Sequence, residues 1–342
     1  MNRRGYTTGH TPSSLRASTV GGFLATRSGG SMSSLYGKIE DLALGLKVVL
    51  ADGTIIDCKA VPRHSVGPDL RQLFIGSEGT LCVITEATLR LFALPAERRF
   101  RSFAFNDVHS GLEAIRLIFR HGTTPSIVRL YDAEDTAFTF AGHFEVEDGD
   151  CMLLLGFDGS PERVDLDESV TAQICKEMGG KDFGEGPSRH WWEHRYDMYY
   201  PSRLTTAGYS IGDTIDVVAT YDRLENVYHD MKEAMESQGA IVLAHFSHMY
   251  QNGGSIYMIF FISLPDAESA WAAYKRVWDA GVEACLRAGG TMSHQHGVGL
   301  WRSTYTEPEL GNAFEVLKRI KAVLDPHGIL NPGKLGLEVS SE

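Results

Sequence analysis

The sequence predicts an α+β protein in which helices cover a mostly antiparallel sheet, preceded by a glycine-rich region of short strands. From about residue 96 onward, strand-like runs alternate with helix-length amphipathic runs. Residues 1–95 are instead rich in Gly, Ser and Thr, and few of their patterns are long enough for a helix. Pro95 and the charged residues that follow it mark the boundary between these two regions. Alternating elements of this kind favour a layer of helices on a sheet.

The composition is that of an ordinary globular protein, with 43% hydrophobic and 22% charged residues over a chain of 342. This length is sufficient for two domains. The net charge of -12 argues against a nucleic-acid partner, which needs a clustered basic surface. Five scattered cysteines without CxxC spacing fit a reducing compartment. No apolar run is long enough to span a membrane and no secretory signal core is visible, so we expect a cytoplasmic protein.

The first region contains a predicted β-hairpin and a further long strand. Two apolar runs, 46–50 and 54–58, flank Asp52-Gly53, a pair typical of tight hairpin turns. Residues 81–91 form the next strand-like run.

The second region alternates strands with helices as far as a glycine pair at 289–290. Ser160 and Pro161 provide an N-cap and a first-turn proline for one of these helices, which ends at Gly179-Gly180. A final helix carries Phe314 to Leu324 and ends before Pro326. The other predicted strands are 100–105, 126–131, 152–157, 216–220, 241–246 and 256–263, and the other predicted helices are 110–120, 223–237 and 265–287.

Several loops near the N-terminus combine glycine with hydroxyl side chains. Glycine lets the backbone approach a ligand closely, and consecutive N–H groups form a nest for anions. Several such loops in one small region fit a dinucleotide, although each alone is more typical of an ordinary surface turn. The GxGxxG fingerprint is absent, so a doubly wound nucleotide domain is not supported. The loops are 8–15, 18–22, 26–30 and 76–81.

These loops, together with Ile39-Glu40-Asp41-Leu42 and the tail Ile329 to Lys334, resemble the FAD-linked oxidases of the vanillyl-alcohol-oxidase (PCMH) type. Within that group the likeness is greatest to alkyldihydroxyacetonephosphate synthases, and it runs over nearly the whole chain. The resemblance implies a partial PCMH-type FAD-binding domain plus a ferredoxin-like antiparallel α/β cap domain. Its implied domains are the second FAD lobe (1–95), the substrate or cap domain (96–305), and a C-terminal helix and tail packing on the FAD domain (306–342). The family's first cofactor lobe would precede Met1.

By resemblance, three segments would contact FAD, the implied cofactor. Cys82 departs from the family, which usually has glycine there, and its side chain would crowd the flavin. The implied contacts are Ser13, Ser14, Leu15, Arg16, Ala17, Ser18 and Thr19; Thr26, Arg27, Ser28 and Gly29; and Glu78, Gly79, Thr80, Leu81, Cys82, Val83 and Ile84.

A histidine pair near the C-terminus is a candidate catalytic element. The segment from Thr291 to Gly299 begins as a strand, which would place His294 and His296 on one face. Imidazoles there can move protons or hold phosphate; a buried structural pair or a turn is the alternative. The resemblance implies three consecutive histidines at this place, and Gln295 stands for the middle one. Glutamine donates hydrogen bonds but cannot carry a proton.

Tyr257 and Arg129 are the other candidate catalytic residues. Tyr257 falls at the position of the synthases' catalytic tyrosine, although its pattern alone is typical of a core strand residue. Arg129 is a charge within an apolar strand and needs a partner when buried. The resemblance implies that Arg129 faces the flavin or an anionic group of the substrate. The alternative is that Arg129 is an edge residue paired with Asp132.

Two further clusters carry weaker hypotheses. His245 and His248 could join His294 and His296 in a divalent-metal site, as in some related hydroxyacid dehydrogenases, although the synthases need no metal. The aromatic stretch His190 to Arg195, with Tyr199 and Tyr200, could line a tunnel for an acyl chain or simply pack in the core.

The resemblance implies an FAD-dependent enzyme that exchanges the acyl group of acyl-dihydroxyacetone phosphate for a fatty alcohol. Tyr257 and His296 would handle protons, while Arg129 and His294 would hold anionic groups. A D-2-hydroxy acid dehydrogenase and a non-catalytic remnant are the alternatives. The implied partners are a lipid-like or hydroxyacid small molecule, a second copy in a homodimer, and peripheral contact with a membrane, with no nucleic acid.

Overall fold

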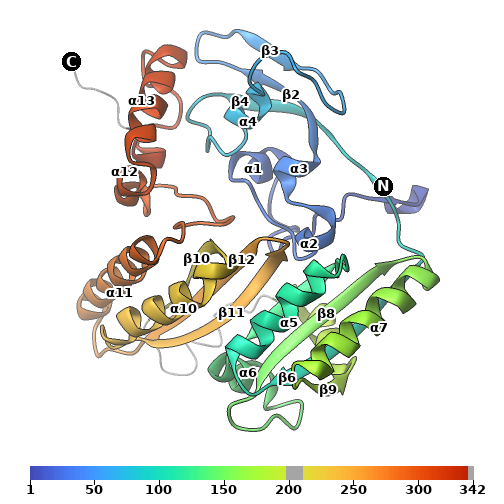
Figure 1. Cartoon of the computed structure of the whole chain (residues 1–342). Helices are drawn as coiled ribbons and strands as arrows, with labels where there is room; N and C mark the ends of the chain where they lie inside the picture. Colours follow the sequence, from blue (N-terminus) through green and yellow to red (C-terminus); the bar gives the residue numbers. More distant parts are fainter. Residues whose placement is uncertain (198–210, 338–342) are drawn as a thin grey trace. The chain divides into compact units, whose positions relative to one another are not determined.

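The computed structural model describes residues 1–197 and 211–337, which form two compact units. Unit 1 comprises residues 1–30, 36–94 and the chain from 293 onward; unit 2 comprises 31–35 and 95–292. Most elements of both are labelled in Figure 1. Tyr199 and Tyr200, named above for the acyl-chain tunnel, lie outside the described residues.

Unit 1 is built around a three-stranded antiparallel sheet in the order β3-β2-β4. The predicted hairpin is confirmed, since Lys47 pairs with Asp57 and the Asp52 carboxylate accepts the Thr54 N–H in the turn. Buried Leu24, Leu42 and Phe74 belong to the core against this sheet. The strands are β1 (Tyr6–Thr7), β2 (Ala43–Val49), β3 (Ile55–Cys58), β4 (Val83–Leu89) and β5 (Phe92–Ala93), and the helices are α1 (Val20–Ala25), α3 (Ile39–Leu42), α4 (Leu70–Phe74), α12 (Thr306–Leu310) and α13 (Asn312–Leu324).

Helix α13 and its tail are held by a buried lysine. Lys321 donates to the carbonyl oxygens of Thr80 at 2.9 Å and Leu330 at 2.8 Å, and it forms an ion pair with Asp325. The Asp325 carboxylate also accepts the N–H groups of Ile329 and Leu330. These bonds satisfy the polar groups where the helix ends and the tail turns.

Unit 2 contains a seven-stranded sheet in the order β10-β12-β11-β7-β8-β6-β9, in which every pairing is antiparallel. The predicted antiparallel α+β arrangement is therefore confirmed. Its strands are β6 (Glu97–Phe105), β7 (Ile127–Tyr131), β8 (Cys151–Gly159), β9 (Lys181–Gly184), β10 (Ile211–Thr220), β11 (Ile241–Tyr250) and β12 (Gly253–Ile262).

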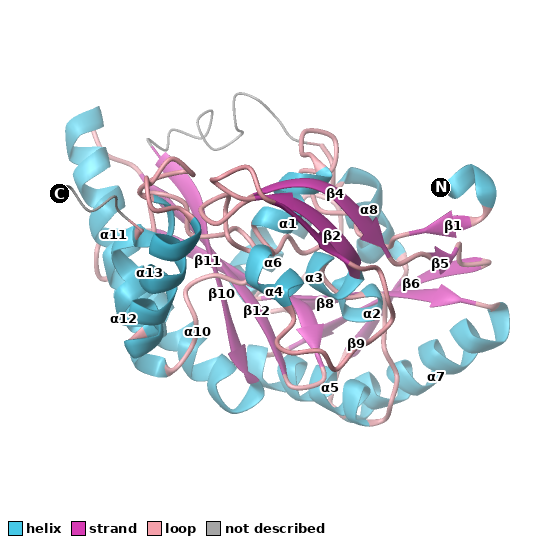
Figure 2. Ribbon diagram, turned by 90° about the horizontal axis from the view of Figure 1, so that it is seen from above, coloured by secondary structure: helices cyan, strands magenta, loops and turns pink. Residues whose placement is uncertain are grey.

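Long helices cover one face of this sheet, as Figure 2 shows for α5, α7 and α10. Phe246 of β11 faces this layer, because its ring packs on that of Tyr228 of α10, with the ring centroids 5.4 Å apart. Shorter helices pack on the opposite face, where Phe140 of α6 and Trp191 of α8 join the cluster around Tyr131. The covering helices are α5 (Val108–Arg120), α7 (Pro161–Glu177), α10 (Tyr221–Glu236) and α11 (Ala267–Ala288); those opposite are α6 (Ala133–Phe140) and α8 (Gly186–His194).

The segment after Met292 differs from the sequence prediction. Thr291 makes only an isolated bridge to Val218, and residues 293–298 form an irregular loop, so the expected strand is wrong. Gly297 and Gly299 adopt positive φ values of 77° and 60°, which an extended strand does not allow. Residues 293–305 belong to unit 1, whereas the sequence placed them in the cap domain.

No helix among the described residues is both long and apolar enough to cross a membrane.

Candidate functional site

A row of polar side chains crosses four neighbouring strands of unit 2. In the sheet register, Tyr131 of β7 stands opposite His245 of β11, and His245 stands opposite Tyr257 of β12. Asp216 of β10 completes the row opposite Tyr257. Directly paired residues point to the same face of a sheet. Because side chains alternate along a strand and Phe246 faces the long helices, this polar row lies on the other face.

Arg129, His245 and Asp135 form a linear network on that face. The Arg129 guanidinium donates to Nε2 of His245 at 2.9 Å and to the hydroxyl oxygen of Tyr131 at 3.0 Å. On the other side of the ring, Nδ1 of His245 lies 2.8 Å from the carboxylate of Asp135. Arginine has no acceptor, so Nε2 must accept and Nδ1–H must donate to Asp135. The network thus fixes one neutral tautomer of His245.

Burial lowers the pKa of His245, and the charge of Arg129 lowers it further; these two effects outweigh the contribution of Asp135. The imidazole therefore stays neutral near neutral pH. The alternative pairing of Arg129 with Asp132 is wrong. Asp132 is buried and accepts bonds from Tyr228 and Lys232 instead, while β7 is a central strand of the sheet.

Tyr257 lies within this polar cluster, and its catalytic role stays a prediction. Its ring stacks on His245 with centroids 4.9 Å apart and planes 18° apart. Its hydroxyl lies 3.4 Å from Nε2 of His248, whose Nδ1 lies 2.8 Å from the hydroxyl of Ser33. The structure therefore brings Tyr257, Arg129 and two histidines together on one face.

Aromatic side chains of α8 pack beside the arginines of this face. The Arg129 guanidinium lies 4.8 Å from the ring centroid of Trp191, and Arg98 lies 4.2 Å from that of Trp192. Contacts of this kind stabilise a half-buried guanidinium. The described part of the aromatic stretch therefore helps to hold Arg129 in place.

The histidine loop, defined as residues 294–299, belongs to unit 1 and is held by two charged side chains. Lys38 donates to the carbonyl oxygen of His294. The Glu78 carboxylate accepts the N–H of Val298 at 2.5 Å and that of Gly299 at 2.7 Å. His294 is buried and His296 is exposed, so the two imidazoles do not share one environment.

The implied flavin contacts fall into loops and turns of unit 1. Residues 13–18 form an exposed loop, and the Thr19 hydroxyl caps α1 by accepting the Gly22 N–H. Arg27 donates to the side chain and the carbonyl of Gln72. Thr80 and Cys82 are buried in the core, where burial raises the Cys82 pKa to about 11. Their contact with flavin stays a prediction.

His10, in the Thr8-Gly9-His10 motif, fits a site for a polar cofactor. Its side chain is only 6% exposed, yet neither ring nitrogen has a hydrogen-bond partner among the described residues. Burial and the nearby charge of Lys38 lower its pKa to about 4. A buried polar group without a partner is costly unless another molecule supplies one. The backbone of His10 and Thr11 also lies so close to Gly30 that a Cβ there would come within 2.6 Å of the Thr11 nitrogen.

The bonds of His245 argue against the four-histidine metal site. Both of its ring nitrogens are engaged, one by the cationic Arg129. Within residues 1–197 and 211–337, no group of three or more His, Cys, Asp or Glu side chains is arranged to hold a metal ion. His245 and His248 belong to unit 2, whereas His294 and His296 belong to unit 1.

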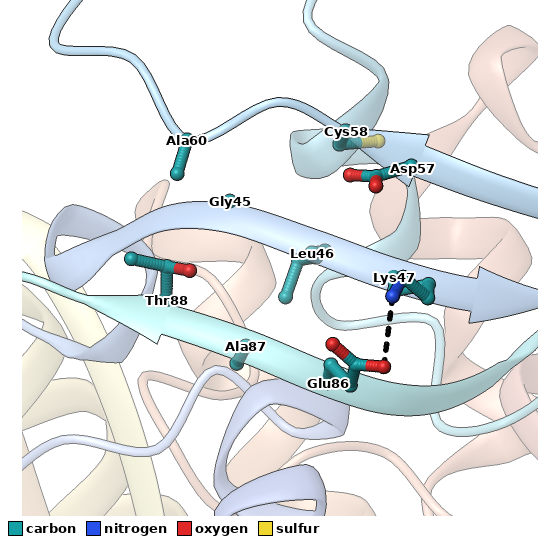
Figure 3. Close-up of a pocket in the computed structure, with 9 residues that line it drawn as sticks. All are labelled: Gly45, Leu46, Lys47, Asp57, Cys58, Ala60, Glu86, Ala87 and Thr88. Atoms are coloured by element: carbon teal, nitrogen blue, oxygen red, sulfur yellow. Dashed lines mark hydrogen bonds and ion pairs between the residues drawn. The ribbon is translucent and has the colours of Figure 1, made fainter.

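A small pocket of about 200 Å³ lies on the three-stranded sheet of unit 1, and Figure 3 shows its lining. Lys47 and Glu86 form an ion pair of 2.8 Å across neighbouring strands there. None of the candidate flavin-binding or catalytic residues lines this pocket. Its size is below the range of about 300–1,000 Å³ that is usual for cofactor sites.

Comparison with known families supports the fold and the cofactor. Residues 94–335 match the C-terminal domain of FAD-linked oxidases, and residues 1–59 match an FAD-binding domain. The chain therefore belongs to the FAD-linked oxidase family, and its cofactor is FAD.

Three groups of relatives illustrate the range of this family. The chain is 34% identical to the FAD-linked oxidoreductase YgcU of Escherichia coli, over 98% of this chain and 72% of that protein. It is 29% identical to the alkyldihydroxyacetonephosphate synthase of Dictyostelium discoideum, over 98% of this chain and 59% of the synthase. It is also 29% identical to the probable mitochondrial D-lactate dehydrogenase of Danio rerio, over 92% of this chain and 64% of that protein.

Solved structures agree with these matches. An alkyldihydroxyacetonephosphate synthase superposes with a TM-score of 0.76 at 28% identity, covering 98% of this chain and 62% of the synthase. The chain thus spans about three-fifths of that protein. The fold is shared with p-cresol methylhydroxylase, at a TM-score of 0.71 and 16% identity, over 95% of this chain and 70% of the other.

Several residues of the site were not identified from the sequence. Asp135, Ser33 and Lys38 come from segments far in the sequence from the histidines that they contact. No local pattern marks such long-range partners. His248 was named from the sequence only as a metal ligand, although Gly253-Gly254 after a strand is typical of a bulge and was a signal for its unusual position.

Proposed function

We propose that the protein is an FAD-dependent enzyme that exchanges the acyl group of an acyl-dihydroxyacetone phosphate for a fatty alcohol. The observation that carries the proposal is the position of the Tyr257 phenol on the face that also carries Arg129 and two imidazoles. The match to synthases over nearly the whole chain supports the substrate class.

Arg129 has the chemistry to hold the anionic part of such a substrate. Its guanidinium carries five N–H donors, and the bonds to Tyr131 and His245 use one each. The remaining donors suit a phosphate or a carboxylate in fork geometry. Trp191 and Tyr131 flank the guanidinium and restrict its movement.

Tyr257 has the chemistry to move a proton at the substrate carbon. A phenol can release and recover a proton when hydrogen-bond partners stabilise both states, and His248 lies beside its hydroxyl. FAD, when bound, supplies an electron-accepting ring system. His10 and the loops of unit 1 are the residues of this chain that would hold it.

The purified protein, supplied with FAD, tests the proposal with acyl-dihydroxyacetone phosphate and a radiolabelled fatty alcohol. We expect the label to enter an ether product and free fatty acid to leave in equal amount. Tyr257→Phe should lower this exchange by about 100-fold or more, the usual contribution of an acid–base group. Tyr274→Phe, on the helix α11, is the matched control. Absence of exchange by the unmodified protein would reject the proposal.

A D-2-hydroxy acid dehydrogenase is the second candidate, and Gln295 favours it. The proton-carrying histidine that the resemblance implies at this place is absent from the chain. The family also includes D-lactate dehydrogenases at 29–30% identity. Anaerobic bleaching of the flavin absorbance by a D-2-hydroxy acid, without ether formation, would establish this activity in place of the exchange.

A further inference from the structure

We propose that His248, oriented by Ser33, is the group that receives the proton of Tyr257. This inference rests on the proposed acid–base function of Tyr257 and assigns its proton partner within unit 2. The sequence had given the second proton-transfer role to His296.

A β-bulge places His248 on the polar face. Between the pairs Ser247–Ser255 and Tyr250–Gly253, β11 has two residues where β12 has only Gly254. In a regular strand, His248 would follow Phe246 onto the face covered by the long helices. The extra residue instead re-aims the side chain, a known use of bulges beside active sites.

The backbone of His248 adopts a conformation that is unfavourable for a side-chain-bearing residue. Its φ is 48°, in the left-handed region. Met249 occupies the helix-facing position, because a Cβ on Gly254 would lie 2.2 Å from the Met249 sulfur. Backbone strain of this kind persists where the surrounding structure enforces it, often at functional sites.

The contacts of His248 form a chain of hydrogen bonds. Its Nε2 lies 3.4 Å from the Tyr257 hydroxyl, and its Nδ1 lies 2.8 Å from the Ser33 hydroxyl. The Ser33 hydroxyl lies a further 3.2 Å from the hydroxyl of Tyr250. For Nε2 to accept from the phenol, Nδ1 must carry the hydrogen and donate to Ser33, which then donates to Tyr250.

The proton transfer itself is balanced within this pair. The O–H bond of Tyr257 breaks, an Nε2–H bond forms, and the products are a phenolate and an imidazolium. The phenolate then takes one proton from the substrate. The imidazolium later donates one proton to the product, which restores both side chains. No electron transfer is involved in this step.

Histidine-selective ¹⁵N NMR of the whole protein tests the assignment without relying on turnover. The His248 resonances are identified by their loss in His248→Asn. We expect the tautomer with hydrogen on Nδ1 in the unmodified protein, and a shift toward a mixture in Ser33→Ala. Ser33→Thr, which keeps the hydroxyl, should restore it. Ser34→Ala is the matched control, because the Ser34 hydroxyl is buried without a hydrogen-bond partner among the described residues.

Two outcomes would overturn the inference. One is a His248 with hydrogen on Nε2 in the unmodified protein, because that nitrogen could not accept the phenol proton. The other is His248→Asn retaining full activity in an exchange-competent enzyme, where we expect a loss of about 100-fold. If the tautomer is as expected and no substrate exchange occurs, the proposed function fails instead.

Discussion

Asp135 is a positioning residue, because it touches the imidazole of His245 rather than a reacting group. Its carboxylate is the acceptor that keeps hydrogen on Nδ1, so that Nε2 can accept from Arg129. The hydroxyl of Thr139 donates to the same carboxylate at 2.9 Å and limits its rotation. The hydrogen-bond partner of a histidine commonly decides its tautomer.

Asp135→Asn should therefore lower activity by about tenfold to 100-fold while the protein remains folded. The amide can turn its N–H toward Nδ1, which would force the opposite tautomer and place two donors against each other at Arg129. Steady-state kinetics and the ¹⁵N signature of His245 measure the effect. Asp230→Asn, on the exposed side of α10, is the control. An unchanged tautomer in Asp135→Asn would contradict this role.

His10 should make the stability of the protein depend on pH when no cofactor is bound. Burial and the charge of Lys38 lower its pKa to about 4, whereas an unfolded histidine has a pKa of about 6.5. A lowered folded-state pKa means that the unfolded chain binds the proton more readily. The stabilisation is thus complete above pH ~6.5 and is lost as the pH falls to about 4.

Urea unfolding of the unmodified protein and of His10→Phe at several pH values measures this contribution. Between pH ~6.5 and ~4, the free energy of unfolding of the unmodified protein should fall by about 3 kcal/mol more than that of the variant. His121→Phe, at an exposed helix end, controls for the loss of a histidine alone. Parallel pH curves for the unmodified protein and His10→Phe would show that His10 does not titrate in this way.

The bulge in β11 requires glycine on its partner strand. Ala at position 254 would place its Cβ 2.2 Å from the Met249 sulfur. Gly254→Ala should lower the free energy of unfolding by about 1–3 kcal/mol, the usual cost of overpacking a core. Gly142→Ala is the control, because a Cβ there meets nothing within 4 Å. Equal thermal midpoints for both variants would show that the bulge can relax.

Lys321 should contribute far more to stability than a lysine one turn earlier. Burial alone would raise the Asp325 pKa, but the bond from Lys321 and those from the Leu330 and Ile329 amides hold it below its ordinary value. Lys321→Met leaves this buried carboxylate unpaired, which should cost about 3–5 kcal/mol. Lys318→Met removes an exposed ion pair with Glu315 and should cost at most about 1 kcal/mol. Similar denaturant midpoints for Lys321→Met and Lys318→Met would contradict the larger contribution of Lys321.

The local elements followed from the sequence, because their signals are short-range. The Asp52-Gly53 turn and the Ser160 cap appear where their residue types favour them. The loop from Ser293 to Gly299 was misjudged, because Lys38 and Glu78 bind it from segments more than 200 residues away. The resemblance pointed to Tyr257 and Arg129 as candidate catalytic residues, but it said nothing of Asp135 or the bulge.

The two units should respond differently to FAD. The predicted contacts, 13–19, 26–29 and 78–84, all belong to unit 1. A ligand that binds only the folded state stabilises the protein, by about 2.7 kcal/mol when its concentration is 100 times Kd.

Hydrogen exchange followed by mass spectrometry should therefore show slower exchange in these segments on adding FAD, and little change in α7 and α11 of unit 2. Protection of α7 and α11 without protection of the three segments would show that the flavin contacts were wrongly assigned. FAD should slow hydrogen exchange in these segments less in His10→Phe than in the unmodified protein, because phenylalanine lacks the two ring nitrogens with which FAD could form hydrogen bonds. Such a difference would connect the His10 imidazole, which has no hydrogen-bond partner among the described residues, to the cofactor.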